Sequence, residues 1–233
     1  MFRLKSINRV CKKYNVDLWH SILFSTKLTN LNLLLVQNKY KKKNRYQNKS
    51  ASLRIDTVKH TSSRKRLSAY GQFLEIRKKI CYIQGGMNKR TYRHLNHLAL
   101  RMKGDFSENM LYLLESRLAM LVYRLGFSKN IFESIQLIFA GQVLVNKKVI
   151  MNPNHIVALN SLVELNYPIK KQQYDALISR LKLRNQPYLQ LQYHEINFLT
   201  MSGIMLRKPF FNEVPFSFNF SPKFFYAEYT GKL

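Results

Sequence analysis

The stretch Lys103–Ile150 constrains the fold more than any other part of the chain, because it predicts two amphipathic helices, a glycine stop and a hairpin within a short span. The first helix is predicted over 108–125, with Ser107 as its N-cap and Gly126 as its stop. Apolar residues recur there at helical spacing and form one stripe that faces a core. They are Leu111, Leu114, Leu118, Leu121, Val122 and Leu125.

Arg117 and Arg124 are the basic residues of this predicted helix. They are separated by two helical turns, about 10 Å along the axis, so they share one face. We expect both guanidinium groups to point away from the core, where they would suit a phosphate backbone.

A second helix is predicted over 129–140, behind a Ser128 cap and ending at Gly141. Its buried residues are Phe132, Ile135, Ile138 and Phe139. The segment that follows predicts strand, turn and strand, with Val143–Val145 and Val149–Ile150 flanking a tip that carries Lys147 and Lys148. Taken alone, each helix would be ordinary core below a solvated charged surface, so it is the order of the pieces that is informative.

Several motifs in this stretch match one known family in order. They are Lys103-Gly104-Asp105-Phe106-Ser107-Glu108-Asn109, Leu113-Leu114-Glu115-Ser116-Arg117-Leu118, Val122-Tyr123-Arg124, Gln136, Gly141 and Val145-Asn146. Together they closely resemble the fourth protein of the small ribosomal subunit, which carries the alpha-L RNA-binding motif here. Two more stretches resemble it in the same order, Cys11-Lys12-Lys13 through Trp19 and Arg64-Lys65-Arg66 through Arg77-Lys78-Lys79.

The resemblance implies an α+β fold in three parts. A mainly helical N-terminal lobe, basic and rRNA-binding, is expected over 1–103, and a compact helix-helix-β-hairpin alpha-L domain over 104–168. Residues 169–233 would form a basic helix, ending before Pro187, and an aromatic-rich tail that packs back on the N-terminal lobe. An alternative for the tail is an exposed aromatic strip that docks a neighbouring protein.

Within the first lobe, residues 37–60 are expected to form an extended basic arm. Residues 37–50 have no apolar periodicity and no acid, so they cannot fold alone and would be ordered by RNA; a disordered linker is the alternative. Further helices are predicted over 64–81, 87–103 and 169–184, with a break at Gly85-Gly86. Two short strands are predicted within 155–165.

The helix over 87–103 places Tyr92, Leu95, Ala99 and Met102 on a buried side. Lys89, Arg93 and His97 follow one another at four-residue spacing along another side. Like charges at this spacing repel by a few tenths of a kcal/mol per pair in water, and a phosphate backbone reverses that cost. We therefore expect this side to contact RNA.

The charge balance supports a polyanionic partner. The 233 residues contain 39 Lys and Arg against 12 Asp and Glu, a net charge of +27 that would repel itself in an isolated fold. No apolar run reaches the roughly 18 residues of a transmembrane helix, so no membrane role is expected. The two cysteines, Cys11 and Cys81, are too few for a disulfide framework or a four-cysteine zinc site, and indicate a reducing compartment.

The chain shows none of the motifs of an enzyme, and we expect no cofactor and no metal. His94 and His97 have no third ligand near them in sequence. Pseudouridine synthases and tyrosyl-tRNA synthetases share the alpha-L motif, but they need a separate catalytic domain that nothing here resembles. The predicted RNA-binding residues are Lys12, Lys13, Arg64, Lys65, Arg66, Arg77, Lys78, Lys79, Lys89, Arg90, Arg93, His97, Arg101, Arg117, Arg124, Lys129, Gln136, Lys147 and Lys148.

The chain departs from the family pattern at three places. Ala119 and Ile135 stand where the family has Asp and Arg, so Lys129, Gln136, Lys147 and Lys148 are expected to carry more of the phosphate binding. Lys147 replaces a glycine at the hairpin tip. Either the turn is looser there or Asn146 takes the left-handed conformation.

The resemblance implies a structural protein of the small ribosomal subunit that binds the 5′ domain of its rRNA early in assembly. It also implies a place near the mRNA entry path, beside the third and fifth small-subunit proteins. Motifs closest to the alphaproteobacterial branch, and a composition expected of an AT-rich gene, favour a mitochondrial protein, with a plastid as the alternative. Residues 1–20 are basic like a presequence but are expected to be mature protein. The rival hypothesis is an RNA-binding assembly or heat-shock factor with the same motif.

Overall fold

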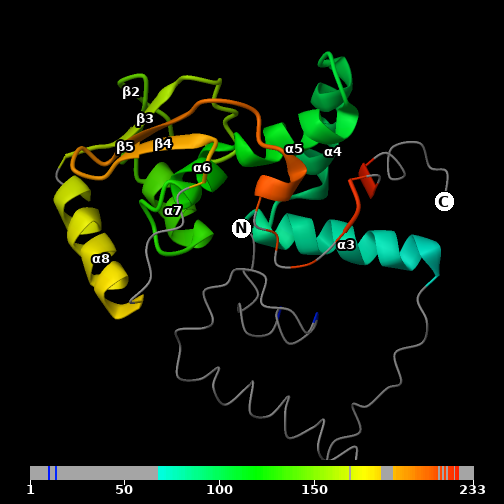
Figure 1. Ribbon diagram of the computed structural model, residues 1–233, viewed down its shortest axis with the longest axis horizontal. Coiled ribbons are helices and arrows are strands. Elements are labelled where there is room, and N and C mark those ends of the chain that lie inside the picture. Colours follow the sequence, from blue (N-terminus) through cyan, green and yellow to red (C-terminus); the bar gives the residue numbers. More distant parts are fainter. Residues whose placement is uncertain are drawn as a thin grey trace, which may run out of the picture.

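The computed structural model describes residues 68–167, 169–184 and 191–214, without the side chains of 180–184. It also describes Val10, Tyr14, Phe216, Phe218, residues 220–222, Phe224 and Phe225. The predicted arm over 37–60 lies outside the described residues, as does Pro187. The described part combines helices with one antiparallel sheet, which confirms the α+β class (Figure 1).

Two helices of the N-terminal lobe meet at the predicted glycine break. Ser68 is the N-cap of helix α3 (Ala69–Ile83), and its hydroxyl accepts a hydrogen bond from the Gly71 amide. Gly85 and Gly86 have φ angles of +79° and +77°, which a residue with a Cβ adopts only with strain. Helix α4 (Lys89–Arg101) then starts in a new direction, inside the predicted range of 87–103.

The helix predicted over 108–125 is two helices, α5 (Phe106–Glu115) and α6 (Leu118–Arg124). At the break, the Val157 amide donates to the Ser116 carbonyl and the Leu118 amide to that of His155. These bonds to a distant loop replace two bonds of a continuous helix. The predicted cap is also wrong: Asp105 is the N-cap, and the Ser107 hydroxyl donates to the Pro222 carbonyl instead.

Helix α7 (Ile131–Phe139) begins two residues later than predicted, with Asn130 as its N-cap. The predicted burial of Phe139 is wrong, because its side chain is 63% exposed at the end of the helix. The Ser128 hydroxyl contacts that of Ser134. The helix ends before Gly141, whose φ is +69°, as the sequence predicted. Helix α8 (Ile169–Arg184) has the bounds that the sequence predicted.

The sheet has five strands in the order β2-β1-β3-β5-β4, and every neighbouring pair is antiparallel. The hairpin is β1 (Val143–Val145) and β2 (Lys148–Val149). Only one strand, β3 (Leu162–Leu165), forms where two were predicted, because Ile156 makes just an isolated bridge with Arg117. The remaining strands are β4 (His194–Asn197) and β5 (Ser202–Met205).

Described residues of the C-terminal tail contact both the sheet and α3. Strand β5 pairs with β3, so two tail strands extend the sheet of the hairpin. A Cβ at Gly203 would lie 2.6 Å from Leu125 Cδ2, so the tail backbone lies close against the end of α6. Further along, Phe224 stacks on Phe73 of α3, with ring centroids 5.3 Å apart.

The main core lies between the sheet and α5, α6 and α7. The inward-facing strand residues Val143, Val163 and Leu165 are at most 2% exposed, and so are Leu114 and Leu121 of the helices. Figure 1 shows α6 and α7 on one side of the sheet and α8 at its margin. Within the described ranges, no helix is both long and apolar enough to span a bilayer.

Candidate nucleic-acid interface

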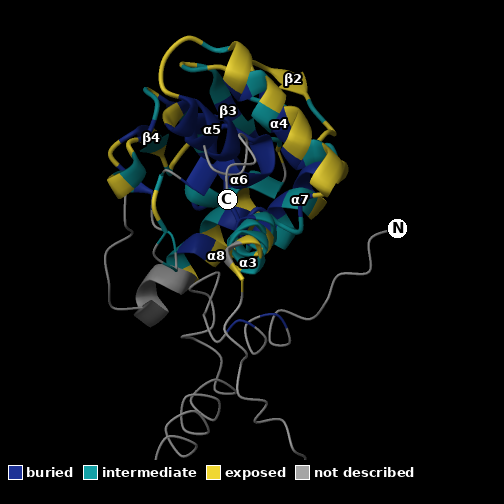
Figure 2. Ribbon diagram, turned by 90° about the vertical axis from the view of Figure 1, so that its right-hand side faces the viewer, coloured by how far each residue is buried: buried dark blue, intermediate teal, exposed yellow. Residues whose placement is uncertain are grey.

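Helix α4 presents a continuous cationic row. Tyr92, Leu95 and Ala99 are 1–2% exposed and fix one side of the helix against the core. The opposite side is exposed, as Figure 2 shows along α4. It carries the predicted residues Lys89, Arg90, Arg93, His97 and Arg101. The helix contains no acid, and no ion pair in the described part of the chain engages these five residues.

The hairpin tip holds a second pair of cations. Asn146 and Lys147 both have positive φ, +49° and +65°, so the turn is a tight left-handed one and not a loose one. The Asn146 side chain accepts a hydrogen bond from the Leu162 amide, while its own amide donates to the Leu162 carbonyl. These two hydrogen bonds fix the turn against β3, and Lys147 and Lys148 are exposed at its tip. The hairpin and α4 lie on the same upper side of the molecule in Figures 1 and 2.

Arg117 does not point away from the core as predicted. It is 2% exposed, and its Nη1 donates to the carbonyl and side-chain oxygens of Gln84, at 2.9 and 3.1 Å. Its Nη2 donates to Asn154 Oδ1 at 3.0 Å. Burial lowers the pKa of the guanidinium to about 10, so it stays cationic at neutral pH. Arg117 joins the turn after α3 to the loop that follows the hairpin.

Arg124 is also turned inward. Its Nε lies 2.9 Å from Glu115 Oε2 and its Nη2 lies 3.1 Å from Glu115 Oε1, and the Glu115 side chain is wholly buried. The hydroxyl of Tyr193 donates to Glu115 Oε2 at 3.3 Å. Burial lowers the pKa of Arg124, but the Glu115 carboxylate outweighs it and raises that pKa overall. Both arginines therefore hold the domain together, since the break after Glu115 rotates them off the face that a single helix would give them.

The cations of α3 are divided. Lys78 is exposed, whereas Lys79 lies 3.0 Å from Glu75 and 5.5 Å from the ring centre of Phe218. Arg77 is half-buried. The structure does not test the other predicted basic residues of this lobe, because they lie outside the described residues. They are Lys12, Lys13, Arg64, Lys65 and Arg66.

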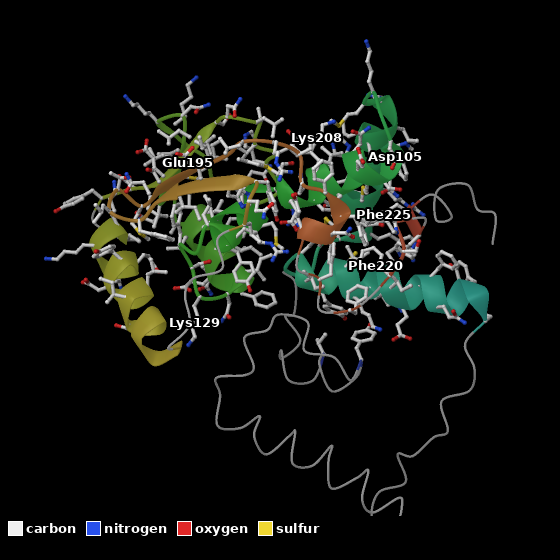
Figure 3. The ribbon with its side chains drawn as sticks, in the orientation of Figure 1. Asp105, Lys129, Glu195, Lys208, Phe220 and Phe225 are labelled. Atoms are coloured by element: carbon white, nitrogen blue, oxygen red, sulfur yellow. The ribbon has the colours of Figure 1, made fainter. Side chains whose placement is uncertain are left out.

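Helix α7 contributes little to a phosphate-binding face, in line with the absence of an arginine at 135. Ile135 packs below the turn before α4, where its Cδ1 would be 2.7 Å from a Cβ at Gly85. Ala119 is fully buried. Lys129 and Gln136 are exposed, but Figure 3 shows Lys129 low on the molecule, on a different side from α4 and the hairpin. The structure thus brings α4 and the hairpin tip to one side and leaves Lys129 apart.

Two exposed residues that the sequence did not assign to RNA, one of them a cation, lie beside this row. His94 and Lys103 are both exposed beside the predicted cations. The signal was present, because the sequence from 87 to 103 contains no acidic residue. In the part of the chain that the structure describes, no group of three His, Cys, Asp or Glu could hold a metal ion.

Comparisons with known proteins identify the family of the chain. The family described as S4 domain matches residues 116–163, from the α5–α6 break to β3. The helices, hairpin and exposed cations therefore define a protein of the S4-domain class.

Two relatives carry the name small ribosomal subunit protein uS4. That of Mycoplasmoides gallisepticum (strain R(low / passage 15 / clone 2)) is 33% identical over 170 residues, which are 73% of this chain and 77% of the relative. That of Wigglesworthia glossinidia brevipalpis is 35% identical over 152 residues, 64% of this chain and 71% of the relative. The chain belongs to the uS4 family of small ribosomal subunit proteins. Proteins of this family are structural and not enzymes, as the sequence predicted.

Proposed function

We propose that this protein is a structural constituent of the small ribosomal subunit that binds the rRNA through α4 and the hairpin tip. The observation that carries the proposal is the cationic row of α4, whose charges face solvent without an acid on the same helix. Cations spaced along a rigid helix match the regular negative charge of an RNA backbone. The net charge of the full chain, +27, also favours a polyanionic partner.

Recognition in this proposal depends on shape more than on base sequence. Rigid basic elements neutralise phosphates of neighbouring RNA helices that would otherwise repel one another, and so fix the angle between them. A site in the 5′ domain, where several rRNA helices meet, fits this mechanism. We extend the proposal to a place near the mRNA entry path, beside the third and fifth small-subunit proteins, by family resemblance.

We also propose a mitochondrial ribosome as the location, with a plastid ribosome as the alternative. The support is the sequence itself: Lys103-Gly104-Asp105-Phe106-Ser107-Glu108-Asn109 resembles the alphaproteobacterial branch, and the composition is that expected of an AT-rich gene. The test is fractionation of the source cells. The protein should sediment with organelle ribosomes, and recovery with cytoplasmic ribosomes alone would contradict the location.

Binding of the full chain to an rRNA 5′-domain fragment tests the RNA surface. For about ten neutralised phosphates, log affinity should fall against log salt with a slope of about −7 to −9. Lys89→Gln with Arg93→Gln should make the slope shallower by roughly 1.5, because two phosphate contacts are lost. The control, Lys170→Gln with Lys171→Gln, removes the same charge from α8. Equal effects of the two double variants would indicate unspecific attraction and contradict the surface.

Co-sedimentation distinguishes the structural role from the rival one. A ribosomal constituent should stay in stoichiometric amounts with mature small subunits through high salt. An assembly or heat-shock factor with the same domain should be found only on precursor particles.

A further inference from the structure

The sheet has a second face that the RNA surface does not use. On the face that meets the core, Val143, Val163 and Met205 are at most 1% exposed. The alternate positions point the other way, and none of them is buried. These outward residues are Leu144, Val149, Leu162, Glu164, Glu195, Asn197, Ser202 and Ile204. We call them the outward face.

The outward face combines apolar and acidic side chains. Leu162 lies opposite Ile204, and Leu144 lies opposite Val149, which is 49% exposed. Glu164 is next to Leu144 across one strand pair, and Glu195 is next to Ile204 across another. Figure 3 labels Glu195 along the sheet, on the side away from α8. No lysine or arginine occupies an outward position of the five paired strands.

These two carboxylates are unusual in a chain with 39 basic and 12 acidic residues. Among the described residues, neither Glu164 nor Glu195 forms an ion pair. An RNA backbone would be repelled by both, and a bare aliphatic row gives phosphates nothing to bind. A polypeptide could pair cationic side chains with the two carboxylates and pack apolar side chains on the aliphatic row.

We propose that the outward face docks a lysine- or arginine-bearing segment of a neighbouring ribosomal protein. Glu164 and Glu195 lie on strands with β5 between them, and their pairing partners Ser202 and Ile204 are two residues apart along β5. The two glutamates are therefore roughly 12 Å apart, at about 4.8 Å per strand and 3.4 Å per residue. The docked segment would therefore place one cation at Glu164 and another at Glu195. An apolar residue between the two cations would pack on Leu162 and Ile204. The inference rests on the proposed function, because the neighbour is present only in the assembled subunit.

Photo-crosslinking in assembled subunits tests the proposal. A photoreactive residue replaces Ile204 in the full chain, and the matched probe replaces Arg93 of α4. The expected products are a protein adduct at 204, whose partner peptide contains Lys or Arg, and an RNase-sensitive adduct at 93. An rRNA adduct at 204, or no adduct there in subunits that contain the protein, overturns the proposal. A protein adduct at 204 without an RNA adduct at 93 refutes the RNA surface and leaves this face standing.

Charge reversal tests the role of the carboxylates. In the variant Glu164→Lys with Glu195→Lys, the protein adduct at 204 should fall about tenfold, since cations would then face cations. Glu108→Lys with Asp175→Lys makes the same charge change at exposed sites elsewhere and should leave the adduct unchanged. Thermal melting confirms that both variants are folded. An adduct unaffected by the reversal overturns the assignment of Glu164 and Glu195.

Discussion

Arg124 and Glu115 form a buried ion pair through two hydrogen bonds, with N···O distances of 2.9 and 3.1 Å. The pair spans the break between α5 and α6, and the hydroxyl of Tyr193 from the tail completes it. Burial and the Glu115 carboxylate both raise the pKa of that tyrosine, so it stays protonated and donates. A single cluster therefore joins both helices to the C-terminal tail.

Removing one partner of this cluster should be costly. Glu115→Ala leaves the Arg124 charge buried without a counter-charge, which typically costs about 3–5 kcal/mol. The measurement is the free energy of unfolding from urea titration of the full chain. Glu213→Gln, which breaks the more exposed pair with Arg207, should have a much smaller effect.

The paired replacement is the control. Glu115→Leu with Arg124→Met removes both charges and should restore most of the loss, because no buried charge is left alone. If Glu115→Ala cost no more than Glu213→Gln, the cluster would not stabilise the domain.

Arg117→Gln should destabilise the protein and leave RNA recognition unchanged. The shorter side chain loses the bonds to Gln84 and Asn154, for which about 2–3 kcal/mol is a reasonable cost. The salt slope of rRNA binding should not change, because the guanidinium does not reach solvent. The measurements are urea unfolding and filter binding below the melting temperature. A shallower slope with unaltered stability would instead place Arg117 on phosphate.

Gly85→Ala should cost more than Gly86→Ala. Both glycines have positive φ, so each alanine carries a backbone penalty of about 1 kcal/mol. Only the new Cβ at 85 meets a neighbour, Ile135 Cδ1 at 2.7 Å, while that at 86 meets nothing within 4 Å. Thermal melting compares the two variants. Adding Ile135→Val, which removes the clashing methyl, should recover part of the difference, and equal melting temperatures would refute the contact.

Lys147→Gly should stabilise the hairpin while weakening RNA binding. Lysine at φ +65° is in the left-handed region, which costs about 1 kcal/mol or more and which glycine adopts without strain. The melting temperature should therefore rise. The salt slope should become shallower by about 0.8, since one phosphate contact is lost. Lys148→Gly, outside the turn, tests whether the gain in stability is conformational. It should make the salt slope shallower without raising the melting temperature.

His194 should make stability depend on pH. Burial, with the nearby charge of Arg124, lowers its pKa to about 3, against about 6.5 in an unfolded chain. Above pH 6.5 the imidazole is neutral in both states. As pH falls below 6.5, only the unfolded state takes up the proton, so the free energy of unfolding decreases by up to about 1.4 kcal/mol per pH unit.

The comparison is between pH 7 and pH 5.5, above the range in which most carboxylates titrate. The protein should lose about 1 kcal/mol more than the variant His194→Gln over this interval. Equal losses would show that the imidazole is protonated in the folded state.

Much of the local structure could be predicted from the sequence, because it depends on neighbours within a few residues. The bounds of α8, the buried and exposed sides of α4 and the stop at Gly141 all follow from periodicity and glycine. The exposed cations of α4 were predicted for the same reason. The fold class and the family were also correct, since the motifs are spread over much of the chain.

The break at Ser116 could not be predicted in this way. Apolar spacing is helical on both sides of it, and the bonds that interrupt the helix come from Val157 and His155, about forty residues away. The extended conformation of the tail was predicted, but its pairing with the sheet of the hairpin was not, because β5 pairs with β3 only when the chain returns to the sheet.

By itself, the sequence determined the helical faces, the turns, the excess of positive charge and the family. Only the tertiary structure decided which cations are available to RNA. Gln84 and Asn154, both more than thirty residues away, bind Arg117, and Arg124 binds Glu115, which itself accepts from Tyr193 of the tail. A guanidinium group binds whichever oxygen is nearest after folding, and periodicity carries no information about that oxygen.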